Sequence, residues 1–167
     1  MRRSYRELVP VPAYPKQSFH IRAEFRAPID FVFAWCTDFR SDDARREKDQ
    51  YTRRVLERSR RRVVFEDLGD AAGGGWWWSH HEVTLRPPDR WTSASIGSHR
   101  TLALDYRLRR LGPERTRLDL TWTRRWNGLA PAPLPRGPYE RATTVAWKHF
   151  AAALEKDYRA ARRTRRR

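Results

Sequence analysis

The stretch LALDYRLRRLGPERTRLDLTWTRRW, residues Leu102–Trp126, contains two runs of alternating apolar and polar residues around Gly112-Pro113-Glu114. Such alternation is typical of a strand that is buried on one face only, and a Gly-Pro pair between two such strands favours a tight turn. The stretch therefore predicts a β-hairpin with strands at 99–111 and 115–126. One face of this hairpin is apolar and must be covered by another part of the chain. It carries Leu102, Leu104, Tyr106, Leu108, Leu118, Leu120 and Trp122.

The element that we expect to cover this face is a long helix after the proline-rich segment 127–138. From about Tyr139 to Arg162, apolar residues recur at the spacing of one helical face. This stripe consists of Tyr139, Thr143, Ala146, Trp147, Phe150, Leu154, Tyr158 and Ala161. It spans about six helical turns. We expect it to lie across the sheet, with Trp147 and Phe150 directed toward the strands.

The remainder of the chain is expected to supply more strands and two short helices. A strand is predicted from Ser18 to about Phe25, followed by a helix that begins near Pro28 and a second helix near residues 42–45. Further strands are predicted at 51–57, 62–68, 76–86 and 91–96. The pattern thus predicts an α+β fold in which a curved antiparallel sheet of about seven strands wraps around one long C-terminal helix.

Three stretches and the closing helix give the chain a resemblance to a known superfamily. The stretches are FRAPIDFVFAWCTDF (Phe25–Phe39), RVVFEDL (Arg62–Leu68) and the hairpin of residues 102–126. Over residues 18–162 the chain resembles the START-related superfamily, also called SRPBCC, which includes plant pollen allergens and polyketide cyclase/dehydrase-like proteins. We expect an extended proline-containing arm at 1–17 before this domain and a basic tail at 163–167 after it.

The resemblance implies a helix-grip fold with a cavity between the sheet and the C-terminal helix. It also implies an apolar small-molecule ligand, such as a lipid, a sterol, a polyketide or a quinone. Members of the superfamily include enzymes as well as carriers and sensors. No cofactor is predicted.

Residues predicted to point into the space between sheet and helix are the candidate ligand-binding residues. They are Trp77, His81, Leu104, Tyr106, Leu120, Trp122, Trp147 and Phe150. Tyr106 and Trp122 would each add a hydrogen-bonding group to an otherwise apolar wall. The alternative interpretation is that these aromatic residues fill the core and leave no cavity, because interiors are normally close-packed.

His81 is the one candidate for acid/base chemistry. In a strand over 76–86, alternation places Trp77, Ser79, His81, Val83 and Leu85 on one face, and the apolar end of that series indicates the inner face. An imidazole in a pocket can transfer a proton near neutral pH. The alternative is a structural histidine held by hydrogen bonds. No partner for His81 is identifiable, so no catalytic residue is assigned and binding is favoured over catalysis.

Other classes of site are not supported by the sequence. His80, His81 and His99 match no common metal-ligand spacing, and the lone Cys36 cannot form an internal disulfide. No apolar run approaches the roughly 20 residues of a membrane span, and the N-terminal residues lack the apolar stretch of a secretion signal. We therefore expect a cytoplasmic protein without a metal.

The formal net charge of +16 leaves two interpretations open. It indicates either an anionic partner, such as nucleic acid or a membrane surface, or a genome rich in arginine codons. The most favoured function is a cytoplasmic carrier or sensor of an apolar molecule. The alternatives are a cyclase/dehydrase-type enzyme that uses the same pocket, and an RNA-, ribosome- or anionic-surface-associated protein that uses its arginine clusters.

Overall fold

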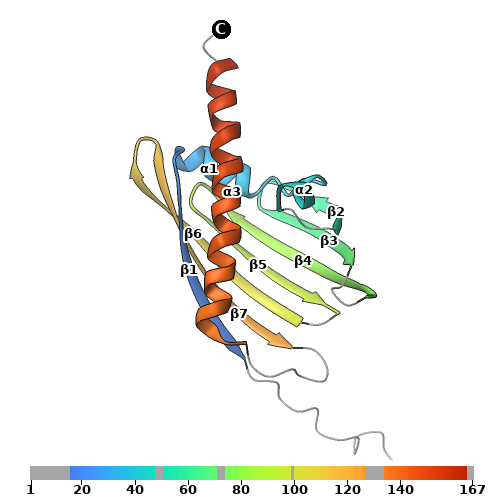
Figure 1. Ribbon diagram of the computed structural model, residues 1–167. Coiled ribbons are helices and arrows are strands. Elements are labelled where there is room, and N and C mark those ends of the chain that lie inside the picture. The colour runs from blue at the N-terminus through green and yellow to red at the C-terminus, as the bar shows by residue number, and fades with distance from the viewer. Residues whose placement is uncertain (1–15, 48–50, 71–73, 99, 127–133, 165–167) are drawn as a thin grey trace, which may run out of the picture.

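The computed structural model describes residues 16–47, 51–70, 74–98, 100–126 and 134–164. Its helices and strands follow the predicted order (Figure 1). The strands are β1 (Gln17–Phe25), β2 (Tyr51–Arg58), β3 (Arg62–Asp70), β4 (Trp76–Arg86), β5 (Arg90–Gly97), β6 (Arg100–Gly112) and β7 (Arg115–Trp126). The helices are α1 (Ile29–Cys36), α2 (Asp43–Glu47) and α3 (Arg136–Thr164). The predicted α+β class is confirmed.

The seven strands form one antiparallel sheet in the order β1-β7-β6-β5-β4-β3-β2. Neighbours from β2 to β7 are consecutive in the chain, which is the pattern of an antiparallel meander. The exception is the ladder between β1 and β7, which pairs Phe19 with Trp122 and Ile21 with Leu120. This ladder pairs the first strand of the chain with the last one and sets the register of β1.

Strand alternation separates an apolar inner face from a charged outer face, as predicted. Leu108, Leu118, Leu120 and Trp122 are all buried in the core. On the outer face, Asp119 contacts Arg22, Arg109 and Arg117. Asp105 likewise contacts Arg90 and Arg107. These exposed ion pairs contribute little stability each, but they place many of the outer-face arginines beside a carboxylate.

Helix α3 runs along β1 on the inner side of the sheet (Figure 1). Its aromatic side chains pack against β1: the Tyr139 ring lies 4.7 Å from the Phe19 ring, and Trp147 lies 6.3 Å from Phe25. Two carboxylates of the helix also accept hydrogen bonds from backbone N–H groups of this part of the chain. His20 donates to Glu140 (2.7 Å), and Arg26 donates to Glu155 (2.9 Å).

The helix docks through a narrow stripe. Leu154 is its one fully buried residue among those described. Trp147, Phe150 and Tyr158 are only half-buried, and Ala146, which was predicted to lie on the stripe, is exposed. The helix therefore fastens to β1 and leaves the inner face of the more distant strands incompletely covered.

Some boundaries differ from the prediction. Helix α3 begins at Arg136 rather than at Tyr139. Pro138 lies in the first turn, where a backbone N–H has no partner inside the helix, so a proline there removes no helical hydrogen bond. It continues through Thr164, beyond the predicted end at Arg162. Most of the predicted arm (1–15) and the end of the predicted tail (165–167) lie outside the described residues. Among the described helices, none is apolar over a length that would cross a bilayer.

We predict that Leu154→Ala lowers the free energy of unfolding by about 2–5 kcal/mol, because it removes the buried anchor of α3 and leaves a cavity. Urea unfolding followed by circular dichroism measures this change. The matched control is Val145→Ala on the same helix, where the side chain is 52% exposed and the expected change is below about 0.5 kcal/mol. Equal losses in the two variants would show that Leu154 does not anchor the helix.

Candidate functional site

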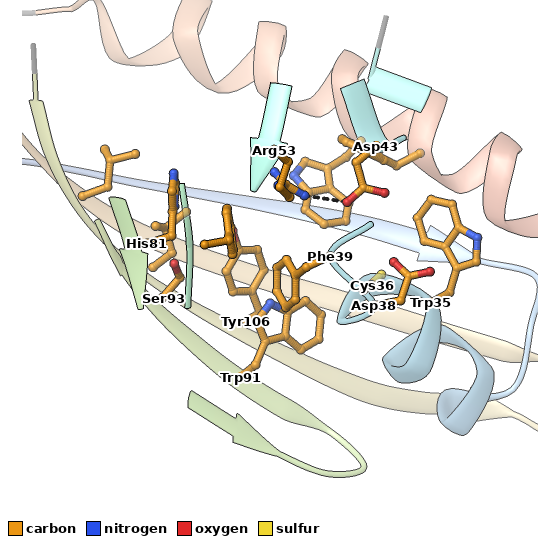
Figure 2. A pocket seen from close by; sticks show the side chains of 15 residues that line it. Trp35, Cys36, Asp38, Phe39, Asp43, Arg53, His81, Trp91, Ser93 and Tyr106 are labelled. Carbon is orange, nitrogen blue, oxygen red and sulfur yellow. Dashed lines mark hydrogen bonds and ion pairs between the residues drawn. The ribbon is translucent and has the colours of Figure 1, made fainter. Parts of the chain in front are cut away.

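A cavity of about 280 Å³ lies between the inner face of the sheet, helix α3 and the segment from the end of α1 to α2. Figure 2 shows the side chains that surround it. The wall is formed by Trp35, Cys36, Asp38, Phe39, Asp43, Arg53, Phe65, His81, Trp91, Ser93, Leu102, Leu104, Tyr106, Trp147 and Phe150. The cavity exists because α3 packs against β1 and does not press on β3 to β6.

Aromatic rings make up most of the apolar wall. On the sheet, Trp91 and Tyr106 stack with their ring centroids 4.7 Å apart and their planes 11° from parallel. Trp147 approaches Tyr106 from the helix at 6.2 Å and lies 5.2 Å from Phe150. The faces and edges of these aromatic rings line the enclosed space, so the wall is suited to packing against another ring.

One corner of the cavity is charged. The Arg53 guanidinium donates hydrogen bonds to both carboxylate oxygens of Asp67, at 2.8 and 2.9 Å, and a further one to Asp43. Its carbon also lies 4.3 Å from the centre of the Phe65 ring. Burial alone would lower the pKa of Arg53, but the hydrogen bonds and charge of Asp67 raise it above its ordinary value. The group therefore stays charged, and two-point pairing fixes its plane.

His81 lies beside this corner, in the cavity wall (Figure 2). Its ring stacks on Phe65 at 4.5 Å and 9°. Its Nε2 is 2.8 Å from Ser79 Oγ, with which it shares a hydrogen bond, and 3.9 Å from Asp67 Oδ2. Burial lowers the pKa of His81 to about 4, and the Asp67 charge offsets this only partly because Arg53 and Arg100 oppose it. The imidazole is therefore neutral at pH 7 and a weaker base than a solvated histidine, with the Asp67 charge favouring its protonated form.

Cys36 also lines the cavity, but its chemistry is that of an apolar side chain. Burial, together with the charges of Asp38 and Asp43, raises the pKa of its thiol well above the ordinary value. A thiol that stays protonated is a poor nucleophile. Within the described residues, no group of three or more His, Cys, Asp or Glu side chains is arranged to hold a metal ion.

The structure brings five of the eight candidate ligand-binding residues together in the cavity wall. They are His81, Leu104, Tyr106, Trp147 and Phe150. Leu120 and Trp122 lie in the closed core instead, because β1 and α3 cover that part of the sheet, and Trp122 stacks on Phe19 at 5.3 Å. Trp77 shares the inner face but lies outside the cavity wall, 6.1 Å from the Tyr51 ring.

Several wall residues were not predicted. Trp91 and Ser93 alternate onto the inner face of β5, so the pattern that located Leu104 and Tyr106 also indicates them. Arg53 and Asp67 face each other across the β2–β3 ladder, and opposite charges at paired strand positions are a detectable signal. Trp35, Asp38, Phe39 and Asp43 come from the α1–α2 segment, whose path over the cavity has no sequence signature.

Comparisons with known proteins identify the fold. No protein-family model and no curated protein matches the chain. The ZhuI aromatase/cyclase from Streptomyces sp. R1128 superposes with a TM-score of 0.65 and 17% identity, over 87% of this chain and 94% of that one. A START superfamily protein from Mycobacterium smegmatis has a TM-score of 0.58 and 14% identity, over 86% and 98%. The di-domain ARO/CYC StfQ of the steffimycin biosynthetic pathway has a TM-score of 0.66 and 14% identity, over 89% and 52%.

At these low identities the similarity shows the fold alone. The chain has the helix-grip fold of START-related proteins, as the sequence resemblance implied.

We predict that His81 makes the folded protein less stable as the pH falls from about 6.5 to 4. In this range the unfolded chain binds a proton at His81, whose ordinary pKa is about 6.5, and the folded chain does not. Acidification from pH 6.5 to pH 4 therefore lowers the free energy of unfolding, by up to roughly 3 kcal/mol near pH 4. Urea unfolding of wild type and His81→Gln at pH 4 to 7 isolates this contribution, because other groups titrate equally in both. A His81 ring that titrates near pH 6.5 by NMR would contradict the assignment.

Proposed function

We propose that this protein binds an apolar small molecule that contains rings, in the cavity between the inner face of the sheet and α3. The observation that carries the proposal is a space of about 280 Å³ whose wall is mainly aromatic and leucine side chains. Ligand pockets of known proteins are usually apolar, with a few polar groups that orient the ligand, and begin near 300 Å³. The size supports a compact ligand of two or three fused rings more than a long acyl chain.

Two polar groups support an oriented mode of binding. His81 and Ser93 lie on neighbouring strands of the same wall, and Figure 2 shows both beside the aromatic group of Tyr106 and Trp91. A hydroxyl or carbonyl oxygen on the ligand would find hydrogen-bonding partners at that side, while its rings pack against the aromatic side chains. The fold of a START superfamily protein and of an aromatase/cyclase supports the same use of the cavity.

We predict that Trp147→Ala weakens binding of the neutral fluorescent probe 1-aminoanthracene about tenfold or more, because it removes the ring that α3 presents to Tyr106. Fluorescence titration measures the affinity. The matched control is Trp76→Ala, which removes a tryptophan that is 66% exposed and lies on the outer face. Native mass spectrometry of the purified protein tests for a copurifying ligand. Absence of probe binding, or equal affinity in wild type and Trp147→Ala, would overturn the proposal.

A second candidate function is a cyclase/dehydrase-type enzyme, and one observation favours it. The neutral His81 in the wall is supported by Asp67, which Arg53 fixes from the other side. In such a reaction the imidazole would take a proton from a carbon next to a carbonyl of a poly-β-ketone chain. That carbon would then form a bond to a second carbonyl carbon of the same chain, whose oxygen takes the proton back from the imidazolium and becomes a hydroxyl. Loss of this hydroxyl together with a second proton from the same carbon would release water and leave a carbon–carbon double bond.

We predict for this case that His81→Gln lowers the rate of ring formation from heptane-2,4,6-trione at least a hundredfold and leaves 1-aminoanthracene affinity within about threefold of wild type. The absorbance of the aromatic product gives the rate. The matched control is His20→Gln, a histidine of the outer face. Wild-type rates equal to those of buffer would exclude this reaction and leave the binding function intact.

The remaining predictions on partners and location gain no support from the site. Nothing in the described residues favours a nucleic-acid partner, because many of the outer-face arginines contact carboxylates. A cytoplasmic location stays a prediction.

A further inference from the structure

The strongest unexplained feature of the molecule is a buried cation at the end of β7. Arg124 is 4% exposed and lies on the inner face, where its alternation partners are apolar core residues. Its guanidinium carbon lies 3.8 Å from the centre of the Trp126 ring and 5.6 Å from that of Tyr139. Within the described residues, the buried side-chain nitrogens without a hydrogen-bond partner are Arg124 Nε and Trp126 Nε1. Both nitrogens are hydrogen-bond donors, and the Arg124 guanidinium lies over the Trp126 ring.

The Tyr139 hydroxyl accepts a hydrogen bond from the Arg124 side chain, and the other polar groups described around Arg124 are committed elsewhere. Gln17, which pairs with Arg124 across the β1–β7 ladder, exchanges two hydrogen bonds with the backbone of Leu134. Glu140 of α3 accepts hydrogen bonds from the His20 N–H and from Arg136. Burial lowers the pKa of Arg124, and the nearby cation Arg100 adds to this effect, with only the Tyr139 phenol opposing it. The Arg124 guanidinium is therefore a buried cation that has a phenol hydroxyl, and no carboxylate, as partner among the described residues.

This position adjoins both the cavity and the start of α3. Leu102, which lines the cavity, is the cross-strand neighbour of Arg124 on β6. Facing residues on neighbouring strands lie about 5 Å apart at their Cβ atoms, so Arg124 lies beside Leu102 on the inner face, next to the residues that line the cavity. Figure 1 shows the first turns of α3 beside the end of β7. The first turn carries no acidic side chain, so the positive end of the helix dipole adds to the local positive potential.

We propose that Arg124 and the Trp126 indole N–H form a binding site for an oxyanion, a carboxylate or phosphate group, at the Leu102 end of the cavity. If the oxyanion is the acidic group of the cavity ligand, this site rests on the proposed function. A free inorganic anion is the other source of the same chemistry. A buried charge without a counter-ion among the described residues is costly to keep, and the two adjacent unsatisfied donors Arg124 Nε and Trp126 Nε1 indicate an acceptor that binds from outside the chain. A carboxylate or phosphate oxygen matches the fork of donors on a guanidinium.

The test uses two ligands that differ in charge and little else: 2-naphthylacetic acid, which is ionised at pH 7, and its neutral amide. Each displaces 1-aminoanthracene from the full-length protein in a fluorescence titration. We expect wild type to prefer the acid about tenfold, since hydrogen bonds to charged groups are strong in buried sites. In Arg124→Met we expect that preference to disappear, with affinity for the amide within about twofold of wild type.

Arg125→Met is the matched control, because it removes the same charge from the next residue of β7, which is exposed on the outer face. It should keep the preference for the acid. Trp126→Phe, which keeps the ring and removes the N–H, should lower the preference two- to fivefold. If Arg124→Met also fails to bind the amide, Trp126→Phe decides: an unchanged preference in that variant overturns the proposal.

A third arm separates the two sources of the anion. In this arm, inorganic phosphate is added and tryptophan fluorescence is measured. Quenching in wild type but not in Arg124→Met, combined with equal affinity of wild type for the acid and the amide, would assign the site to a free anion. Equal affinity of wild type for acid and amide, together with no Arg124-dependent effect of phosphate, would overturn the site. In that case binding of the amide that still depends on Trp147 would leave the proposed function standing.

Discussion

The contact between α3 and β1 is the constraint on which the other features depend. A helix of this length could in principle lie over the middle of the sheet and close it completely. Here Leu154 anchors it, and Tyr139 and Trp147 pack on Phe19 and Phe25 of the edge strand. Because the helix is held at one edge, the inner face of β3 to β6 has no continuous cover, and the α1–α2 segment completes the enclosure. The cavity is thus a consequence of where the helix docks.

Hydrogen bonding explains why the helix docks at this edge. An edge strand presents backbone N–H groups that need partners, and an exposed row of them invites association with other chains. Glu140 and Glu155 accept hydrogen bonds from the N–H groups of His20 and Arg26, so the helix satisfies donors that the sheet leaves open. The same side chains therefore fasten the helix and protect the edge.

The two buried arginines of the inner face differ in a way that separates structure from function. Arg53 is neutralised by Asp67 and Asp43, and that ion pair holds the corner in which His81 is kept neutral. Among the described residues, Arg124 has the Trp126 ring and the Tyr139 hydroxyl as partners and no carboxylate. A buried charge with partners supports a rigid wall, whereas a buried charge without them is a cost that a bound anion would offset. The described inner face therefore combines one arginine that is balanced by carboxylates with one whose described partners carry no negative charge.

The amino-acid sequence by itself determined the elements of the fold and the side of each strand that is buried. Alternation in residues 102–126 and the helical stripe from Tyr139 to Tyr158 are local patterns, and local patterns follow from backbone geometry alone. The same reasoning placed His81, Leu104 and Tyr106 on the inner face. Only the tertiary structure decided which inner residues line a space and which are sealed in the core, as the contrast between Tyr106 and Trp122 shows. That distinction depends on where α3 and the α1–α2 segment lie relative to the sheet, and long-range packing of this kind leaves no periodic signal in the chain.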